Sequence, residues 1–202
     1  MNNSKFIKVI GEDKKEKFTD CSLSSETEGR IISVNKKFIA MSWQNSGEIV
    51  VVDSSLPSQI KIDQPKIKGP KGKILDLEFS PFNKNILAST NDNFSIFIWK
   101  IPEEGIAKDI KKEEQIYNGH SKKVNFVSFN PVAEDVICSG ACPREIQVWN
   151  ITKGENYIKM KADNNPSSIS WNPNGSLIGA STCNRYMNIF DPRSKKKLLG
   201  MK

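Results

Sequence analysis

The 202-residue chain lacks most of the residues that catalytic and metal sites require. It has one histidine and four cysteines, and no two cysteines form a Cys-x-x-Cys pair. Structural zinc normally takes four Cys or His ligands, and a single histidine held in a turn leaves no base to activate a nucleophile. No Gly-rich phosphate loop is present, since Gly69-Pro70-Lys71-Gly72-Lys73 has the wrong spacing. We therefore expect no enzyme activity, no metal and no cofactor.

Long apolar runs and a secretory signal are also missing. The longest purely apolar run, Ile49–Val52, is far shorter than the about 20 residues that span a bilayer. The N-terminus has no apolar h-region, and the cysteines do not have the spacing of a disulfide framework. The sequence predicts no membrane span and a reducing, cytoplasmic setting.

The charge is basic but dispersed. The formal net charge is +7, yet the lysines occur in short runs interleaved with Glu and Asp. Aromatic residues make up 8% of the chain and do not alternate with the lysine runs, as stacking platforms for nucleic acid would require. We expect no specific nucleic-acid binding. The hydrophobic content of 37% is enough to form a core.

What the chain does have is an internal repeat. Residues 75–81, 124–131 and 168–173 each run an alternating strand into a proline, and each is followed by a strand that ends in Trp99, Trp149 or Phe190. The prolines lie 50 and 42 residues apart. A period of about 40 to 45 residues with several short strands per unit is typical of a propeller blade. The fold class predicted is all-β, a partial β-propeller of about four antiparallel four-stranded blades.

The repeats also suggest boundaries within the chain. We expect an N-terminal strand and irregular loop over residues 1–29, then blades over 30–68, 69–118, 119–162 and 163–202. In the first blade the alternation predicts strands at 31–34, 38–43 and 49–52, with an outer edge strand near Ile60–Ile62. Half a propeller ring would leave the flat faces of both terminal blades uncovered, so self-association through open blade edges is expected.

The third unit resembles a WD repeat. Gly119-His120 stands 29 residues before Trp149-Asn150, the spacing of the Gly-His and Trp-Asp ends of such repeats. The resemblance implies a buried hydrogen-bonded lock through His120, Ser139 and Trp149, with Pro143 in the place of the usual Asp. We expect this chain of bonds to be broken at Pro143, leaving an imidazole N–H unpaired at a cost of about 1–3 kcal/mol. Ser89 and Trp99 form the corresponding pair in the second unit.

A closer resemblance extends over nearly the whole chain. The segments that carry it are Ser4-Lys5-Phe6, Val34 to Ala40, Leu75-Asp76, Trp99 to Gly105, Gly119 to Val124, Trp149-Asn150, Ser170 to Ile178 and Asp191-Pro192-Arg193. In this order the chain resembles the N-terminal part of coronin, the actin-binding WD-repeat family. The resemblance implies a non-catalytic interaction module that binds filamentous actin in the cytoplasm, at the actin-rich cortex. Other cytoskeletal proteins are further expected partners.

The chain departs from the family in one segment. Coronins have an Asp-x-Arg-type segment that is tied to filament binding, and the nearest match here, Asp20-Cys21-Ser22-Leu23, lacks the Arg. A generic WD-repeat scaffold, or a truncated coronin paralogue without actin binding, therefore remains an alternative. The candidate actin-facing basic residues are Lys17, Arg30, Lys36, Lys37, Lys71, Lys73, Lys122 and Lys123.

Overall fold

The computed structural model describes residues 18–22, 29–44, 46–56, 59–69 and 72–201. These residues form four antiparallel four-stranded sheets and no helix, which confirms the predicted all-β partial propeller. The expected strand at residues 5–10 lies outside the described residues. The strands are β1 (Ile32–Val34), β2 (Phe38–Trp43), β3 (Glu48–Asp53), β4 (Ile67–Lys68), β5 (Ile74–Phe79), β6 (Ile86–Asn91), β7 (Ser95–Lys100), β8 (Gln115–Asn118), β9 (Val124–Phe129), β10 (Val136–Ala141), β11 (Glu145–Asn150), β12 (Glu155–Lys161), β13 (Pro166–Trp171), β14 (Ile178–Thr182), β15 (Met187–Asp191) and β16 (Lys196–Met201).

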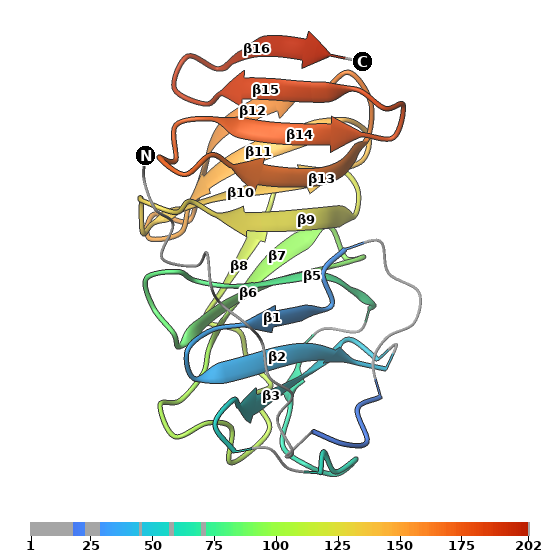
Figure 1. Ribbon diagram of the computed structural model, residues 1–202, viewed down its shortest axis with the longest axis vertical. Coiled ribbons are helices and arrows are strands. Elements are labelled where there is room, and N and C mark those ends of the chain that lie inside the picture. The colour runs from blue at the N-terminus through green and yellow to red at the C-terminus, as the bar shows by residue number, and fades with distance from the viewer. Residues whose placement is uncertain (1–17, 23–28, 45, 57–58, 70–71, 202) are drawn as a thin grey trace, which may run out of the picture.

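Each sheet is a simple meander of four consecutive strands, and the four sheets follow one another along the long axis of the molecule (Figure 1). The first strands of the sheets, β1, β5, β9 and β13, lie next to one another as the inner strands of the array. Apolar side chains fill the layers between successive sheets. The closing aromatics Trp99, Trp149 and Phe190 are each 1% exposed, as expected of large side chains that cover 150–250 Å² on burial.

Meander topology places the connecting loops on two opposite ends of the sheets. We call one end the entry face. It carries the described residues that lead from one sheet into the next (69 and 72–73, 119–123, 162–165) and the loops 92–94, 142–144 and 183–186. The other end, the return face, carries the loops after each first and each third strand, including 35–37, 80–85, 130–135, 172–177 and 192–195.

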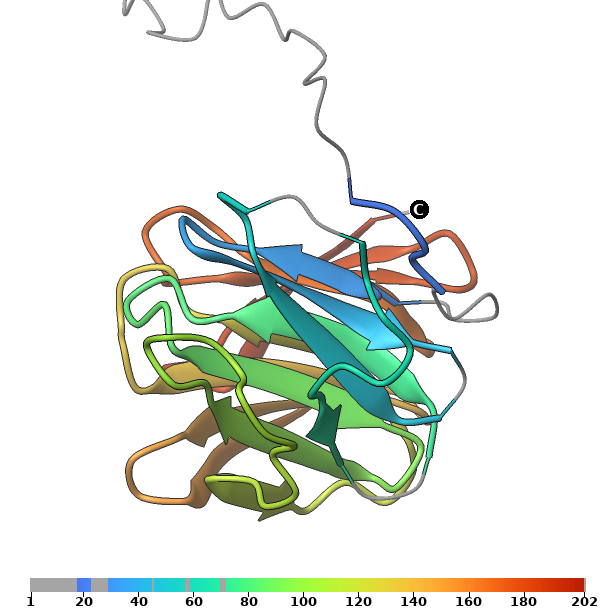
Figure 2. The same ribbon diagram turned by 90° about the horizontal axis from the view of Figure 1, so that it is seen from below.

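The first sheet differs from the expectation in its outer strand. This strand is β4, and not a strand near Ile60–Ile62. Ile60 is instead 1% exposed and packs with Met41, Trp43 and Val50 on the side of the sheet that faces away from the second sheet, with Phe18 beside them. The Ile60 N–H donates to the Thr19 carbonyl at 3.0 Å, which holds the two segments over that side. Figure 2 shows the segment around Thr19 and the loop after β3 crossing this end of the molecule.

The two ends of the array are therefore unequal. The expectation that both flat terminal faces are uncovered is wrong for the first sheet, because the chain folds back over it. It holds for the fourth sheet, where β16 is exposed along its length and Met187, Leu199 and Met201 are between 42% and 44% exposed. Cross-strand pairs Met187–Met201 and Ile189–Leu199 place these side chains on one face of the sheet.

Candidate interaction faces

The third sheet contains a complete hydrogen-bonded lock between the entry loop and its middle strands. The Trp149 indole N–H donates to the Ser139 hydroxyl at 2.8 Å, and the same hydroxyl lies 2.6 Å from Nε2 of His120. Nδ1 of His120 lies 2.9 Å from a carboxylate oxygen of Glu145. A hydroxyl has one hydrogen, so Ser139 donates to Nε2 and the imidazole donates from Nδ1 to Glu145.

Glu145 corrects the expectation that this lock is broken at Pro143. The acceptor comes from the first residue of β11 rather than from the preceding turn, so the imidazole N–H is paired. Burial lowers the pKa of His120 although Glu145 acts against it. Partial burial acts to raise the pKa of Glu145, but the hydrogen bonds that its carboxylate accepts from His120 and Ser121 outweigh this effect, and the pKa is lowered. The neutral imidazole and the ionised carboxylate are thus the stable forms in the folded chain.

The locks of the neighbouring sheets are shorter. In the second sheet the Trp99 indole donates to Ser89 at 2.8 Å, and Pro70, which stands in the histidine place, lies outside the described residues. In the fourth sheet Thr182 donates to Asn184 at 2.6 Å, and Phe190 has no N–H to extend the chain of bonds. The structure therefore brings together the positions predicted from the WD spacing in two groups. Ser89 and Trp99 meet in the second sheet, and His120, Ser139 and Trp149 meet in the third.

The predicted basic residues do not form one patch. Lys122 and Lys123 are exposed on the entry face, and Lys73 lies in the entry loop before β5. Lys36 and Lys37 lie on the return face, where the Lys37 ammonium donates to the Glu103 carbonyl. Lys17 and Lys71 lie outside the described residues. The two lysine pairs face opposite ways and cannot contact one flat partner surface together.

A shallow apolar hollow of about 480 Å³ accompanies the lysines of the entry face. Phe94, at the tip of the loop between β6 and β7, is 45% exposed there. Neither Lys122 nor Lys123 has an ion pair within the described part of the chain. The hollow is lined by Asp92, Phe94, Lys122, Lys123, Cys142 and Pro143.

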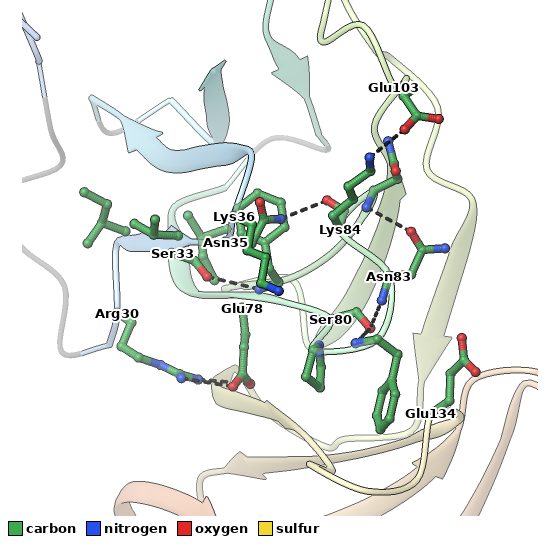
Figure 3. A pocket seen from close by; sticks show the side chains of 17 residues that line it. Arg30, Ser33, Asn35, Lys36, Glu78, Ser80, Asn83, Lys84, Glu103 and Glu134 are labelled. Carbon is green, nitrogen blue, oxygen red and sulfur yellow. Dashed lines mark hydrogen bonds and ion pairs between the residues drawn. The ribbon is translucent and has the colours of Figure 1, made fainter. Parts of the chain in front are cut away.

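Arg30 has a structural role at the inner strands. Its Nε lies 3.0 Å from Asp76 and its Nη1 lies 3.4 Å from Glu78, and it also donates to the Val127 carbonyl. Figure 3 shows Arg30 directed at Glu78 at one end of a groove of about 910 Å³ on the inner strands. At the other end of this groove Lys84 pairs with Glu103 at 2.6 Å. The guanidinium joins three blades and is not a free cation.

Sequence reasoning missed Asp76 and Glu78, which connect neighbouring inner strands. Asp76 is fully buried and accepts the backbone N–H of Val127 at 2.9 Å, while Glu78 accepts that of Phe129 at 2.9 Å. Burial raises the pKa of both carboxyl groups, and Arg30 and the backbone donors act against it. The signal was the alternation of Asp76 and Glu78 with apolar residues on one inner strand.

Comparisons with known proteins cover nearly the whole chain. Coronin-like protein crn1 of Schizosaccharomyces pombe is 27% identical over 206 residues, or 96% of this chain and 33% of the relative. Coronin-2A of Bos taurus is 28% identical over 95% of this chain and 39% of the relative. The WD40 domain from Toxoplasma gondii coronin superposes with a TM-score of 0.88 at 28% identity, over 94% of this chain and 50% of that one. These comparisons support a coronin-type partial propeller over nearly the whole chain.

The chain corresponds to part of the WD40 domain of the Toxoplasma gondii coronin. It spans between 33% and 39% of the length of these curated coronins. A family model described as a domain of unknown function, DUF1899, also matches residues 1–57. These residues include the segment Asp20-Cys21-Ser22-Leu23, in which Asp20 accepts a hydrogen bond from Gln59 at 2.6 Å. Ser22 stands where the Asp-x-Arg spacing would place the coronin Arg, and its carbonyl accepts the backbone N–H of Gln44 at 2.8 Å.

The described residues were also compared with the features of a metal site, a reactive thiol and a membrane span. No group of three His, Cys, Asp or Glu side chains lies close enough to hold a metal within the described ranges. Cys138 is fully buried, and burial raises the pKa of its thiol. The portion of the chain that is described contains no helix long and apolar enough to cross a bilayer.

Proposed function

We propose that this partial propeller is a non-catalytic module that binds actin filaments through its entry face. The observation that carries the proposal is the pair Lys122 and Lys123, exposed beside Phe94 and unpaired within the described residues. Exposed cations around an apolar centre suit an acidic protein surface that offers an apolar side chain. The similarity to coronins favours filamentous actin as that partner, and the cytoplasmic actin cortex as the place of binding.

The other basic candidates are less available to a partner. Arg30 is paired with Asp76 and Glu78, and Lys37 donates to a carbonyl oxygen. Lys36 lines a groove that also contains Glu103 and Glu134. Lys73 lies in the entry loop before β5, and Lys71 and Lys17 stay candidates from their sequence positions.

Co-sedimentation with actin filaments over a salt series tests the proposal. Reversing both charges in Lys122→Glu/Lys123→Glu should weaken pelleting by about tenfold, since rim charges contribute up to about 1 kcal/mol each and 1.4 kcal/mol is a factor of ten. The wild-type affinity should fall as salt screens the contact. The matched control is Lys108→Glu/Lys112→Glu, which changes the same charge at exposed positions in the connection between β7 and β8, outside the hollow at Phe94. Equal pelleting of both double variants would exclude the entry face.

A scaffold that does not bind actin is the second candidate. The observation in its favour is the serine at position 22, where the Asp-x-Arg spacing of the coronin segment would place an Arg. Absence of pelleting at low ionic strength, where a charge-driven contact is strongest, would support this candidate and exclude actin binding. Other cytoskeletal proteins would then be the partners to seek.

A further inference from the structure

A second groove, of about 430 Å³, lies on the return face between the third and fourth sheets. Its volume is in the range of about 300–1,000 Å³ that is typical of ligand sites. It is built entirely from described residues and is on the opposite side of the blades from Lys122 and Lys123. It is lined by Asn130, Ala133, Val136, Val148, Ile158, Trp171, Gly175, Ser176, Pro192, Arg193 and Lys195.

One wall of this groove is fixed by hydrogen bonds between the two sheets. The Asn130 amide donates to the Gly175 carbonyl at 2.9 Å, and its oxygen accepts the N–H groups of Val132 and Ala133 at 2.9 Å each. Gly175 has φ of +66°, and a Cβ at this position would lie 2.3 Å from the Asn130 oxygen. Only glycine allows this close approach, so the wall is formed before any ligand arrives.

The floor is apolar and includes a fixed indole. Trp171 donates its N–H to the Ser128 carbonyl at 3.1 Å, which leaves the ring beside Val136 and Ile158. Trp171 is half-buried, whereas Trp43, Trp99 and Trp149 are each 1% exposed. An apolar side chain that enters the groove would therefore remove both itself and Trp171 from water.

The rim is basic. Arg193 and Lys195 are exposed in the turn between β15 and β16, and neither side chain makes a hydrogen bond or an ion pair within the described parts of the chain. Asp191 holds this turn by accepting the backbone N–H of Arg193 at 2.9 Å. Two unpaired cations beside an apolar floor are complementary to a carboxylate that neighbours an apolar side chain.

We propose that this groove binds a short acidic peptide segment of a partner protein, with an aliphatic side chain on Trp171 and an adjacent Asp or Glu at Arg193 and Lys195. Such a contact lies on the face opposite to the proposed actin surface and is independent of it. The groove is short and open and has apolar residues on its floor alone, so it suits one or two side chains better than a long acyl chain.

Trp171 fluorescence and calorimetry test the proposal with three synthetic peptides. The probe is acetyl-GDLLDEG-amide, and the matched peptides are acetyl-GDAADEG-amide, without the aliphatic anchor, and acetyl-GNLLNQG-amide, without the carboxylates. The probe should bind, and each matched peptide should bind at least about tenfold more weakly, a factor that corresponds to 1.4 kcal/mol. Binding of all three peptides alike, or of none, would overturn the proposal, as would binding of phosphatidylserine vesicles in place of the probe.

Two variants locate the site. Arg193→Glu/Lys195→Glu changes exposed residues of a turn, and Ala133→Trp places a large side chain in the groove; both should weaken binding of the probe at least about tenfold. Lys108→Glu/Lys112→Glu, in the exposed connection between β7 and β8 and outside the groove, should leave probe binding unchanged. Urea midpoints equal to that of the wild type establish that Arg193→Glu/Lys195→Glu is folded. Undiminished probe binding by this folded variant refutes the site. Actin pelleting of the same variant is measured separately, so that the outcome for this groove is distinguished from the outcome for the entry face.

Discussion

The buried Asp76 carboxylate offers the sharpest test of how the blades are held together. It accepts three donors of Arg30 at 3.0–3.1 Å and the N–H of Val127 at 2.9 Å, so it connects the approach to β1, strand β5 and strand β9. Asp76→Ala would remove the buried carboxylate that three Arg30 donors share and leave the buried Val127 N–H without an acceptor, while Arg30 keeps Glu78 and the Val127 carbonyl. Removal of one partner from a buried ion pair costs about 3–5 kcal/mol.

This cost converts into a large change in urea unfolding. With a slope of about 2–3 kcal/mol per molar urea, a loss of about 3–5 kcal/mol lowers the midpoint by about 1–2 M. The measurement is urea unfolding followed by circular dichroism. The matched control is Glu103→Ala, whose ion pair with Lys84 involves side chains that are 65% and 45% exposed, and which should not move the midpoint measurably.

A double-mutant cycle with Arg30→Ala separates the pair from its surroundings. Because the two residues share several hydrogen bonds, the double variant should be less destabilised than the sum of the single variants, with a coupling of about 1–3 kcal/mol. Additive single effects, or an Asp76→Ala midpoint within about 0.3 M of the wild type, would refute the assignment of Asp76 as the connection between blades.

Two further predictions concern the His120 lock and the open end of the array. Burial lowers the pKa of the His120 imidazole below its ordinary value of 6.5, so the unfolded chain binds a proton at a higher pH than the folded chain does. The free energy of unfolding should therefore be constant above about pH 7 and should fall as the pH drops below about 6.5. His120→Gln should remove this loss in unfolding measured from pH 7 to pH 5, and an unchanged slope would contradict the neutral imidazole. At the fourth sheet, we expect the exposed Leu199 and Met201 to cause self-association, so Leu199→Lys/Met201→Lys should reduce the mass seen by light scattering, and a wild-type monomer at all concentrations would contradict this.

The sequence predicted the strands better than their partners. The strand at Phe38–Trp43 has the predicted bounds, because strand-forming runs and the turns that interrupt them are local features. The outer strand of the first sheet was misplaced, because a run such as Ile60–Ile62 has the same local pattern whether it joins a sheet or packs on one. Only the burial of Ile60 against Trp43 distinguishes the two cases.

For the candidate site, too, the residues set by local spacing were predicted and their tertiary partners were not. The WD spacing located His120, Ser139 and Trp149, because their separations are fixed by the length of the strands between them. Glu145 was not found as the acceptor, because the family pattern places the acceptor in the turn before it. The lysines could be named from the sequence, but their division between two faces follows from the direction of each strand in the meander.

The amino-acid sequence by itself determined that this chain forms repeated four-stranded units with buried aromatic ends, because alternation and repeat spacing are properties of neighbouring residues. The tertiary structure alone decided which charges are free and which join blades. Arg30 and Asp76 are 46 residues apart, and Asp76 and Val127 are 51 apart. Such pairs meet only when separate sheets place their inner strands side by side, and that packing turns a basic candidate into a structural contact while Lys122 and Lys123 stay exposed.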